Sequence, residues 1–157
     1  MKNKQFDEDI FRAAAETVEV LALMSLVPGA ESAEDSQAKR SAHVDFTGPC
    51  DGSLVISISQ RLLPELAGNM LGEEDCAECT SYQQGDALKE LANVICGNIL
   101  PIVGGAEAIF HVGTPRLAEG QDSAGARQRG ASAGGAELFL DQGILRVDLY
   151  INEESVV

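Results

Sequence analysis

The sequence has no tryptophan, and aromatic residues make up only 4% of it. A platform of rings for stacking nucleic acid bases or sugars is therefore not expected. Basic residues are also scarce, with 11 Lys and Arg against 25 Asp and Glu, so the formal net charge is −14. A chain this acidic, with no basic cluster, is repelled by nucleic acid backbones and by anionic lipid headgroups. These absences predict a protein that binds neither nucleic acid nor a membrane.

A long apolar run is missing as well. Two lysines and then acidic residues precede Ile10, so the amino-terminal segment lacks the apolar region of a secretory signal. The longest apolar stretch with few charges, residues 18–27, is too short to span a bilayer. We therefore expect a cytoplasmic protein. Its 157 residues, 45% of them hydrophobic, suffice for a single domain, 1–157, with a hydrophobic core.

Cysteine is scarce too, with four residues: Cys50, Cys76, Cys79 and Cys96. Cys76 and Cys79 form a CxxC motif, which is typical of half a zinc site or of a redox pair. Zinc would need two more ligands, and the two histidines are far apart in the sequence. The flanks of the motif are acidic and polar, unlike the strand and helix around a thioredoxin motif. We favour free thiols, with a thiol or zinc protein as an alternative.

Periodicity and turn residues predict the order of the elements. We expect helices at residues 7–26, 61–71 and 81–100, the last capped by Ser81 with Gln84 and broken or kinked at Pro101. We expect strands at residues 44–47, 54–59, 109–112, 138–140 and 144–151. Residues 119–136 hold hardly any large apolar side chain, so we expect a flexible loop there. Hairpins separated by helices predict an α+β fold with a mainly antiparallel sheet packed with long helices.

The helix expected after residue 81 carries the most informative pattern. At about 100° per residue, its apolar residues share one face: Leu88, Leu91, Ala92, Ile95 and Ile99. Asp86, Glu90, Asn93 and Gly97 follow one another along a different face. Asn is only a middling helix former, because its amide competes for backbone hydrogen bonds. Spacing alone is compatible with a solvated polar face that contains one unusual Asn.

This helix and its surroundings resemble the CheC/CheX family of bacterial chemotaxis phosphatases, and the CheX members most closely. The resemblance rests on four segments: Asp86-x3-Glu90-x2-Asn93 with Gly97-Asn98, Gly52–Ser59, Asn69–Glu74 and Thr114-Pro115. It covers most of residues 42–118, and the final hairpin fits in outline. CheC-type members carry a second Glu-x2-Asn on their first helix, where this chain has Glu16 and Glu19 without an Asn. The resemblance therefore implies one active site, as in CheX.

The resemblance also implies a substrate, a response regulator such as CheY that is phosphorylated on an Asp, in chemotaxis or related two-component signalling. Hydrolysis of an acyl phosphate needs a well-placed water more than it needs covalent catalysis. The Asn93 amide offers donors and an acceptor without a charge, so it is the candidate for holding that water. Glu90 is then expected to pair with a lysine of the regulator.

Asp86, Gly97 and Asn98 are the candidate partner-binding residues. Asp86 either steers the partner or favours the helix N-terminus, and Gly97 either permits close approach or reflects packing. Magnesium would belong to the regulator, and no cofactor or metal is expected on this chain. The family precedent further suggests a homodimer joined at strand edges, with Ile144–Ile151 as a candidate edge. The alternative function is a non-catalytic module that sequesters or localises a regulator.

Overall fold

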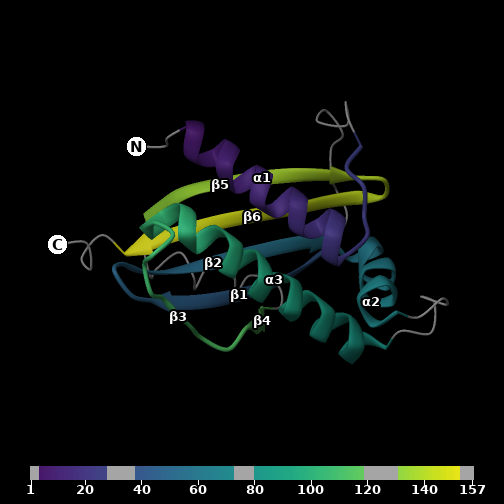
Figure 1. Cartoon of the computed structure of the whole chain (residues 1–157). Helices are drawn as coiled ribbons and strands as arrows, with labels where there is room; N and C mark the ends of the chain where they lie inside the picture. Colours follow the sequence, from purple (N-terminus) through teal and green to yellow (C-terminus); the bar gives the residue numbers. More distant parts are fainter. Residues whose placement is uncertain (1–3, 28–37, 73–79, 119–130, 153–157) are drawn as a thin grey trace.

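The computed structural model describes residues 4–27, 38–72, 80–118 and 131–152. These residues form two layers, with an antiparallel sheet on one side and helices α1 and α3 lying across one of its faces (Figure 1). A third helix, α2, lies at one end of the sheet (Figure 1). This arrangement confirms the α+β fold with a mainly antiparallel sheet.

The sheet of the described residues has six strands: β1 (Lys39–Thr47), β2 (Asp51–Ser59), β3 (His111–Val112), β4 (Arg116–Ala118), β5 (Ala131–Leu140) and β6 (Gly143–Asn152). Their order is β3-β1-β2-β6-β5, and β4 also pairs with β1. Every pairing is antiparallel. The expected hairpins β1–β2 and β5–β6 are both present, and β2 joins them by pairing with β6.

The helices are α1 (Lys4–Leu21), α2 (Leu63–Leu71), which follows a short 3-10 turn at Gln60–Leu62, and α3 (Ser81–Gly104). α2 has Pro64 in its first turn and ends at Gly72, whose φ of 72° is readily adopted only by glycine. The N-cap of α3 is Thr80, one residue before the expected cap at Ser81. Thr80 and Gln83 exchange the two hydrogen bonds of a capping box. α3 also continues through Pro101 to Gly104, beyond the predicted break.

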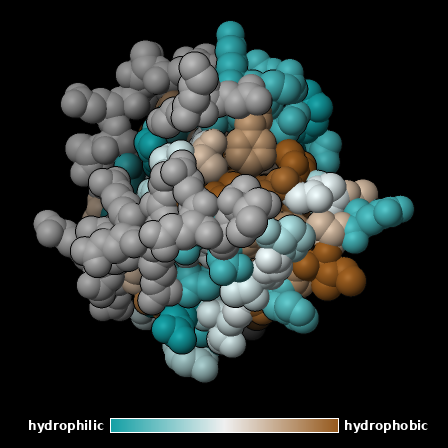
Figure 2. Space-filling view, turned by 90° about the vertical axis from the view of Figure 1, so that its left-hand side faces the viewer, coloured by the Kyte–Doolittle hydropathy of each residue, from teal (hydrophilic) through white to brown (hydrophobic). Residues whose placement is uncertain are grey.

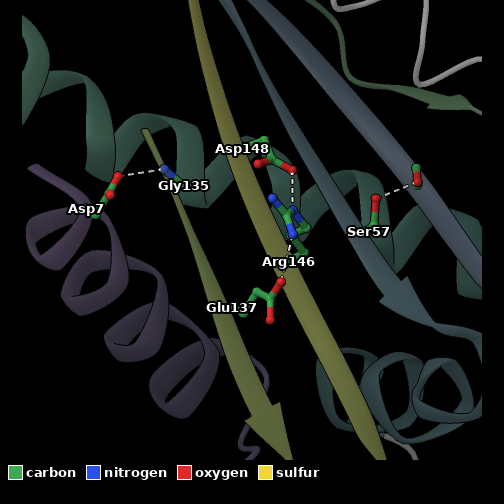
Figure 3. A network of polar contacts seen from close by, with 7 residues as sticks. Asp7, Ser57, Gly135, Glu137, Arg146 and Asp148 are labelled. Carbon is green, nitrogen blue, oxygen red and sulfur yellow. Dashed lines mark hydrogen bonds and ion pairs between the residues drawn. The ribbon is translucent and has the colours of Figure 1, made fainter. Parts of the chain in front are cut away.

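The core lies between the helices and the sheet. Its α3 side is the predicted apolar stripe, since Leu88, Leu91, Ala92, Ile95 and Ile99 are all buried. α3 is long and apolar enough for a membrane span by composition alone, but here it packs against α1, α2 and β1. On the other face of the sheet, the Arg146 side chain contacts Glu137 at 2.7 Å and Asp148 at 2.9 Å (Figure 3).

The first helix ends earlier than predicted, at Leu21 instead of residue 26. Leu23 has a φ of 55°, which takes the chain out of the helix. Leu26 then forms a bridge with Leu140, and the Val27 N–H donates to the Phe139 carbonyl at 2.8 Å. The apolar residues after Leu21 therefore pair beside β5 instead of extending α1.

The predicted loop at residues 119–136 is wrong over its last part, because β5 begins at Ala131. Residues 119–130 lie outside the described residues. The small side chains of β5 serve close packing against α1. A Cβ on Gly134 would lie 2.8 Å from the Asp7 carboxylate and 2.9 Å from Ile10. The Gly135 N–H also donates to Asp7 at 3.0 Å (Figure 3).

The proposal that Ile144–Ile151 is an edge strand is also wrong. β6 pairs with β2 on one side and with β5 on the other, so its backbone groups are used within the chain. Among the described strands, β5 lies at one edge of the sheet, and β3 and β4 lie at the other. The Leu26 bridge and the Asp7 contact already occupy part of the β5 edge.

Candidate functional site

α3 presents the predicted polar line to solvent. Asp86, Glu90, Asn93 and Gly97 are all exposed, whereas the apolar stripe of the same helix is buried. The helical period that buries the apolar stripe thus brings these four residues to the surface. The structure therefore places the candidate catalytic pair, Glu90 and Asn93, side by side on an accessible part of the helix.

A groove of about 440 Å³ runs beside this pair. Its residues come from the end of α2, from α3 and from the segment before β4: Met70, Leu71, Asp86, Ala87, Lys89, Glu90, Asn93, Thr114 and Pro115. Pro115, which is distant from Asn93 in the sequence, is thus in the same groove. A concave site with apolar walls and a few polar groups is the usual form of a binding site. We call it the α2–α3 groove.

The two candidate catalytic side chains are available for interaction with a partner. Within the residues that the structure describes, neither Glu90 nor Asn93 makes a side-chain hydrogen bond or an ion pair. Since the amide of Asn93 is exposed, both its donors and its acceptor can bind water or a ligand. The carboxylate of Glu90 can receive a cation from outside the chain.

Asp86 has a partner in its own helix. Its carboxylate lies 3.2 Å from the Lys89 ammonium, and the two side chains are about half and one third exposed. Asp86 lies beyond the first turn of α3, and that first turn contains no acidic residue. The favourable effect of the helix dipole falls off within that first turn. The interpretation of Asp86 as a helix-terminus residue is therefore not supported, and Asp86 instead lines the α2–α3 groove.

Gly97 continues the line of polar residues one turn beyond Asn93. A Cβ built at this position meets nothing within 4 Å. By contrast, a Cβ on the buried Gly85 of the same helix would lie 2.7 Å from Leu117. Glycine inside a helix costs about 0.5–1 kcal/mol relative to alanine. Packing among the described residues therefore does not require the glycine at position 97.

Asn98 lies apart from the other candidates. Its Nδ2 donates to the Thr17 hydroxyl at 2.8 Å, and that hydroxyl donates to the Ala13 carbonyl at 2.8 Å. Asn98 lines a different groove, of about 570 Å³, between α1 and α3. The side chain thus connects the two helices, and the structure does not bring it together with Glu90 and Asn93.

Six groove residues were not predicted as site residues: Met70, Leu71, Ala87, Lys89, Thr114 and Pro115. Met70 and Leu71 fall in the segment that resembles the end of a family helix, but the sequence offers no sign that this end reaches Asn93. One local feature of the sequence could have identified Leu71 as a groove residue: it is a large apolar residue directly before the glycine that ends α2. Lys89 could have been noted from its spacing of three residues from Asp86.

The described cysteines are buried, which disfavours reactive thiols. Burial raises the pKa of Cys96 to about 12. Burial, together with the nearby charge of Asp51, also raises the pKa of Cys50. Cys76 and Cys79 lie outside the described residues, so the CxxC hypothesis is not tested. In the ranges 4–27, 38–72, 80–118 and 131–152, no three His, Cys, Asp or Glu residues are grouped to hold a metal ion.

Solved structures show where this fold occurs. The CheX–CheY–BeF3–Mg complex from Borrelia burgdorferi matches with 20% identity and a TM-score of 0.67, over 94% of this chain and 98% of that chain. CheX from Desulfovibrio desulfuricans matches with 18% identity and a TM-score of 0.65, over 94% and 99%. FliY from Thermotoga maritima matches with 14% identity and a TM-score of 0.56, over 98% and 93%. These similarities show the fold.

The sequence itself shows the family. No curated protein sequence matches the chain significantly. The model of the family described as chemotaxis phosphatase CheX matches residues 40–134, which is more than half of the chain. The match includes α2, α3 and every residue of the α2–α3 groove. The chain therefore belongs to the CheX family of chemotaxis phosphatases.

Proposed function

We propose that this protein is a phosphatase that dephosphorylates the phospho-aspartate of a CheY-type response regulator. The observation that carries the proposal is the position of Asn93, whose amide is exposed in a groove beside Glu90 and has no partner among the described residues. The family supports the reaction type. A relative of the same fold is described in complex with CheY, beryllium trifluoride and magnesium.

The Asn93 amide would hold one water in line with the phosphorus atom. The water oxygen forms a bond to phosphorus while the bond from phosphorus to the aspartyl oxygen breaks. Inorganic phosphate and a free carboxylate are released. Positioning supplies much of the catalysis in such a reaction. A neutral amide suits this task, because a carboxylate at the same place would repel the phosphoryl oxygens.

Glu90 would dock the regulator. It lies one turn before Asn93 on the same face, so a lysine of the regulator that pairs with Glu90 would align Asn93 with the phosphoryl group. Asp86 and Gly97 would extend the contact along the same line. Magnesium would be supplied by the regulator, because this chain is expected to bind no metal itself.

A second candidate function is receiver binding without turnover. Proteins described as FliY and as the FliM middle domain share the architecture with those described as CheX, at TM-scores of 0.56. The fold alone therefore does not distinguish a phosphatase from a binding module. The presence of both Glu90 and Asn93 in the groove favours turnover.

The experiment is to follow the decay of a phosphorylated CheY-type receiver from the same organism with and without the protein. Accelerated release of inorganic phosphate at catalytic amounts of protein supports the phosphatase. Binding to the receiver without acceleration identifies the second candidate instead.

The assembly and location are also proposals. We keep a cytoplasmic homodimer as the expectation from the family. Since β6 is internal, a dimer joined by strand edges would use another edge of the sheet. Sedimentation velocity measures the mass in solution directly.

A further inference from the structure

We propose that Leu71, together with Met70 and Pro115, forms an apolar subsite that receives an aliphatic side chain of the phosphorylated receiver. This side chain would lie next to the lysine that pairs with Glu90. The inference rests on the proposed function and adds to it the chemistry of the partner surface and a residue that contributes to the affinity for the partner.

Leu71 is held at the rim of the groove by a well-anchored helix. The residues that attach α2 to the rest of the molecule, Leu63, Leu66 and Ala67, are buried. The Asn69 amide donates to the Ala22 carbonyl at 2.8 Å, which also fixes the end of α2. Gly72 then ends the helix directly after Leu71. Half of the Leu71 side chain nevertheless remains exposed.

A single exposed leucine needs no explanation, because apolar atoms contribute much of any protein surface. Leu71 differs because it lines the α2–α3 groove with Met70 and Pro115, beside the catalytic candidates Glu90 and Asn93. Apolar surface next to a few convergent polar groups is typical of a binding site. The subsite is therefore part of the functional groove and not an isolated surface contact.

The charges of the groove indicate the kind of occupant. Lys89 is already engaged by Asp86 at 3.2 Å. Glu90 has no cationic partner among the described residues, so the occupant should bring a cation to it. A second copy of this chain is disfavoured, because two chains of net charge −14 would meet at their acidic grooves. A receiver surface that carries a lysine next to an aliphatic side chain fits both the charge and the apolar wall.

The subsite would contribute to affinity and not to the chemical step. Its apolar side chains cannot orient a water or stabilise charge on the phosphoryl group. Their burial against the receiver would stabilise the complex before and during hydrolysis alike. A change that removes only such uniform binding raises KM and leaves kcat unchanged.

The test compares Leu71→Ala with a matched control, Ile109→Ala. Ile109 is 75% exposed and is not part of the groove. It precedes β3, and β3 lies towards the left-hand side of Figure 1, the side that faces the viewer in Figure 2, whereas α2 lies at the right-hand end of Figure 1. The measurements are kcat and KM for the phosphorylated receiver and the Kd for its beryllofluoride form. Leu71→Met keeps the apolar volume and serves as the rescue variant.

We expect Leu71→Ala to raise both KM and Kd by about tenfold with kcat unchanged, since truncation removes part of one buried leucine. Ile109→Ala and Leu71→Met should stay close to the wild type. Equal KM and Kd values for Leu71→Ala and wild type, with wild-type turnover intact, would overturn the subsite alone. If the wild-type protein binds the receiver without turnover, and Leu71→Ala weakens that binding, the subsite is supported and the phosphatase proposal is overturned.

Discussion

The Lys89 ammonium lies 3.2 Å from the Asp86 carboxylate on the surface of α3. Both side chains line the groove that also contains Glu90 and Asn93. One of the two groove carboxylates therefore has an internal counterion, whereas Glu90 has none among the described residues. The two acidic positions, although similar in sequence context, should play unequal parts in docking.

This inequality gives the first prediction. Glu90→Gln should raise KM for the phosphorylated receiver on the order of tenfold, because the partner lysine loses its counterion. Asp86→Asn should change KM by less than about threefold, because an exposed ion pair contributes little. Steady-state phosphate release at several salt concentrations measures both. Equal effects of the two substitutions would contradict a special role for Glu90.

The second prediction concerns Gly97. Gly97→Ala should stabilise the free protein by about 0.5–1 kcal/mol, which raises the Tm by a few degrees. The added methyl group meets nothing within the described structure. The same group should raise KM if the backbone of the partner approaches α3 closely. Thermal unfolding and receiver dephosphorylation are measured on one preparation. A higher Tm with an unchanged KM would show that close approach does not require the glycine.

The third prediction separates Asn98 from the site. Asn98→Ala removes the hydrogen bond to Thr17, which should cost about 1 kcal/mol of unfolding free energy. Activity at a temperature well below Tm should remain at the wild-type level, because Asn98 lies in the groove between α1 and α3. Denaturant unfolding and the phosphatase assay test the two parts. A loss of receiver binding at full stability would restore Asn98 as a partner-binding residue.

The fourth prediction is a pH dependence from Cys96. Its pKa is raised from 9.0 to about 12 by burial, so the folded protein keeps a proton that the unfolded chain releases. This contribution to stability is fully present below about pH 9 and is lost as the pH rises towards 12. Cys96→Ala should reduce the fall in stability over that range when compared with wild type. An identical pH profile would contradict the assignment to Cys96.

The sequence predicted the parts of the fold that depend on local pattern. The apolar period of α3 identified its buried stripe and, with it, the exposed line from Asp86 to Gly97. Pro64 and Gly72 marked the start and end of α2. These features depend on neighbours along the chain, so they are visible without tertiary contacts.

The parts that were missed depend on distant contacts. Gly134 in β5 leaves room for α1, which packs against it. The pairing of β5 with β6 forms a strand from a segment that has little apolar pattern. Apolar and polar residues alternate along β6 in the same way whether the strand lies at an edge or inside the sheet. The pattern therefore did not reveal that β6 is internal. Similarly, Leu71 and Asn93 line one groove only because α2 packs against α3.

The most direct test of the central claim compares two asparagines of α3. Asn93→Ala and Asn98→Ala are assayed against a phosphorylated CheY-type receiver from the same organism, with Kd measured for its beryllofluoride form. Asn93→Ala should lose on the order of 10²-fold in kcat while it retains receiver binding and stability. Asn98→Ala should retain the wild-type activity. Dephosphorylation by Asn93→Ala at the wild-type rate would contradict the assignment of the water to Asn93.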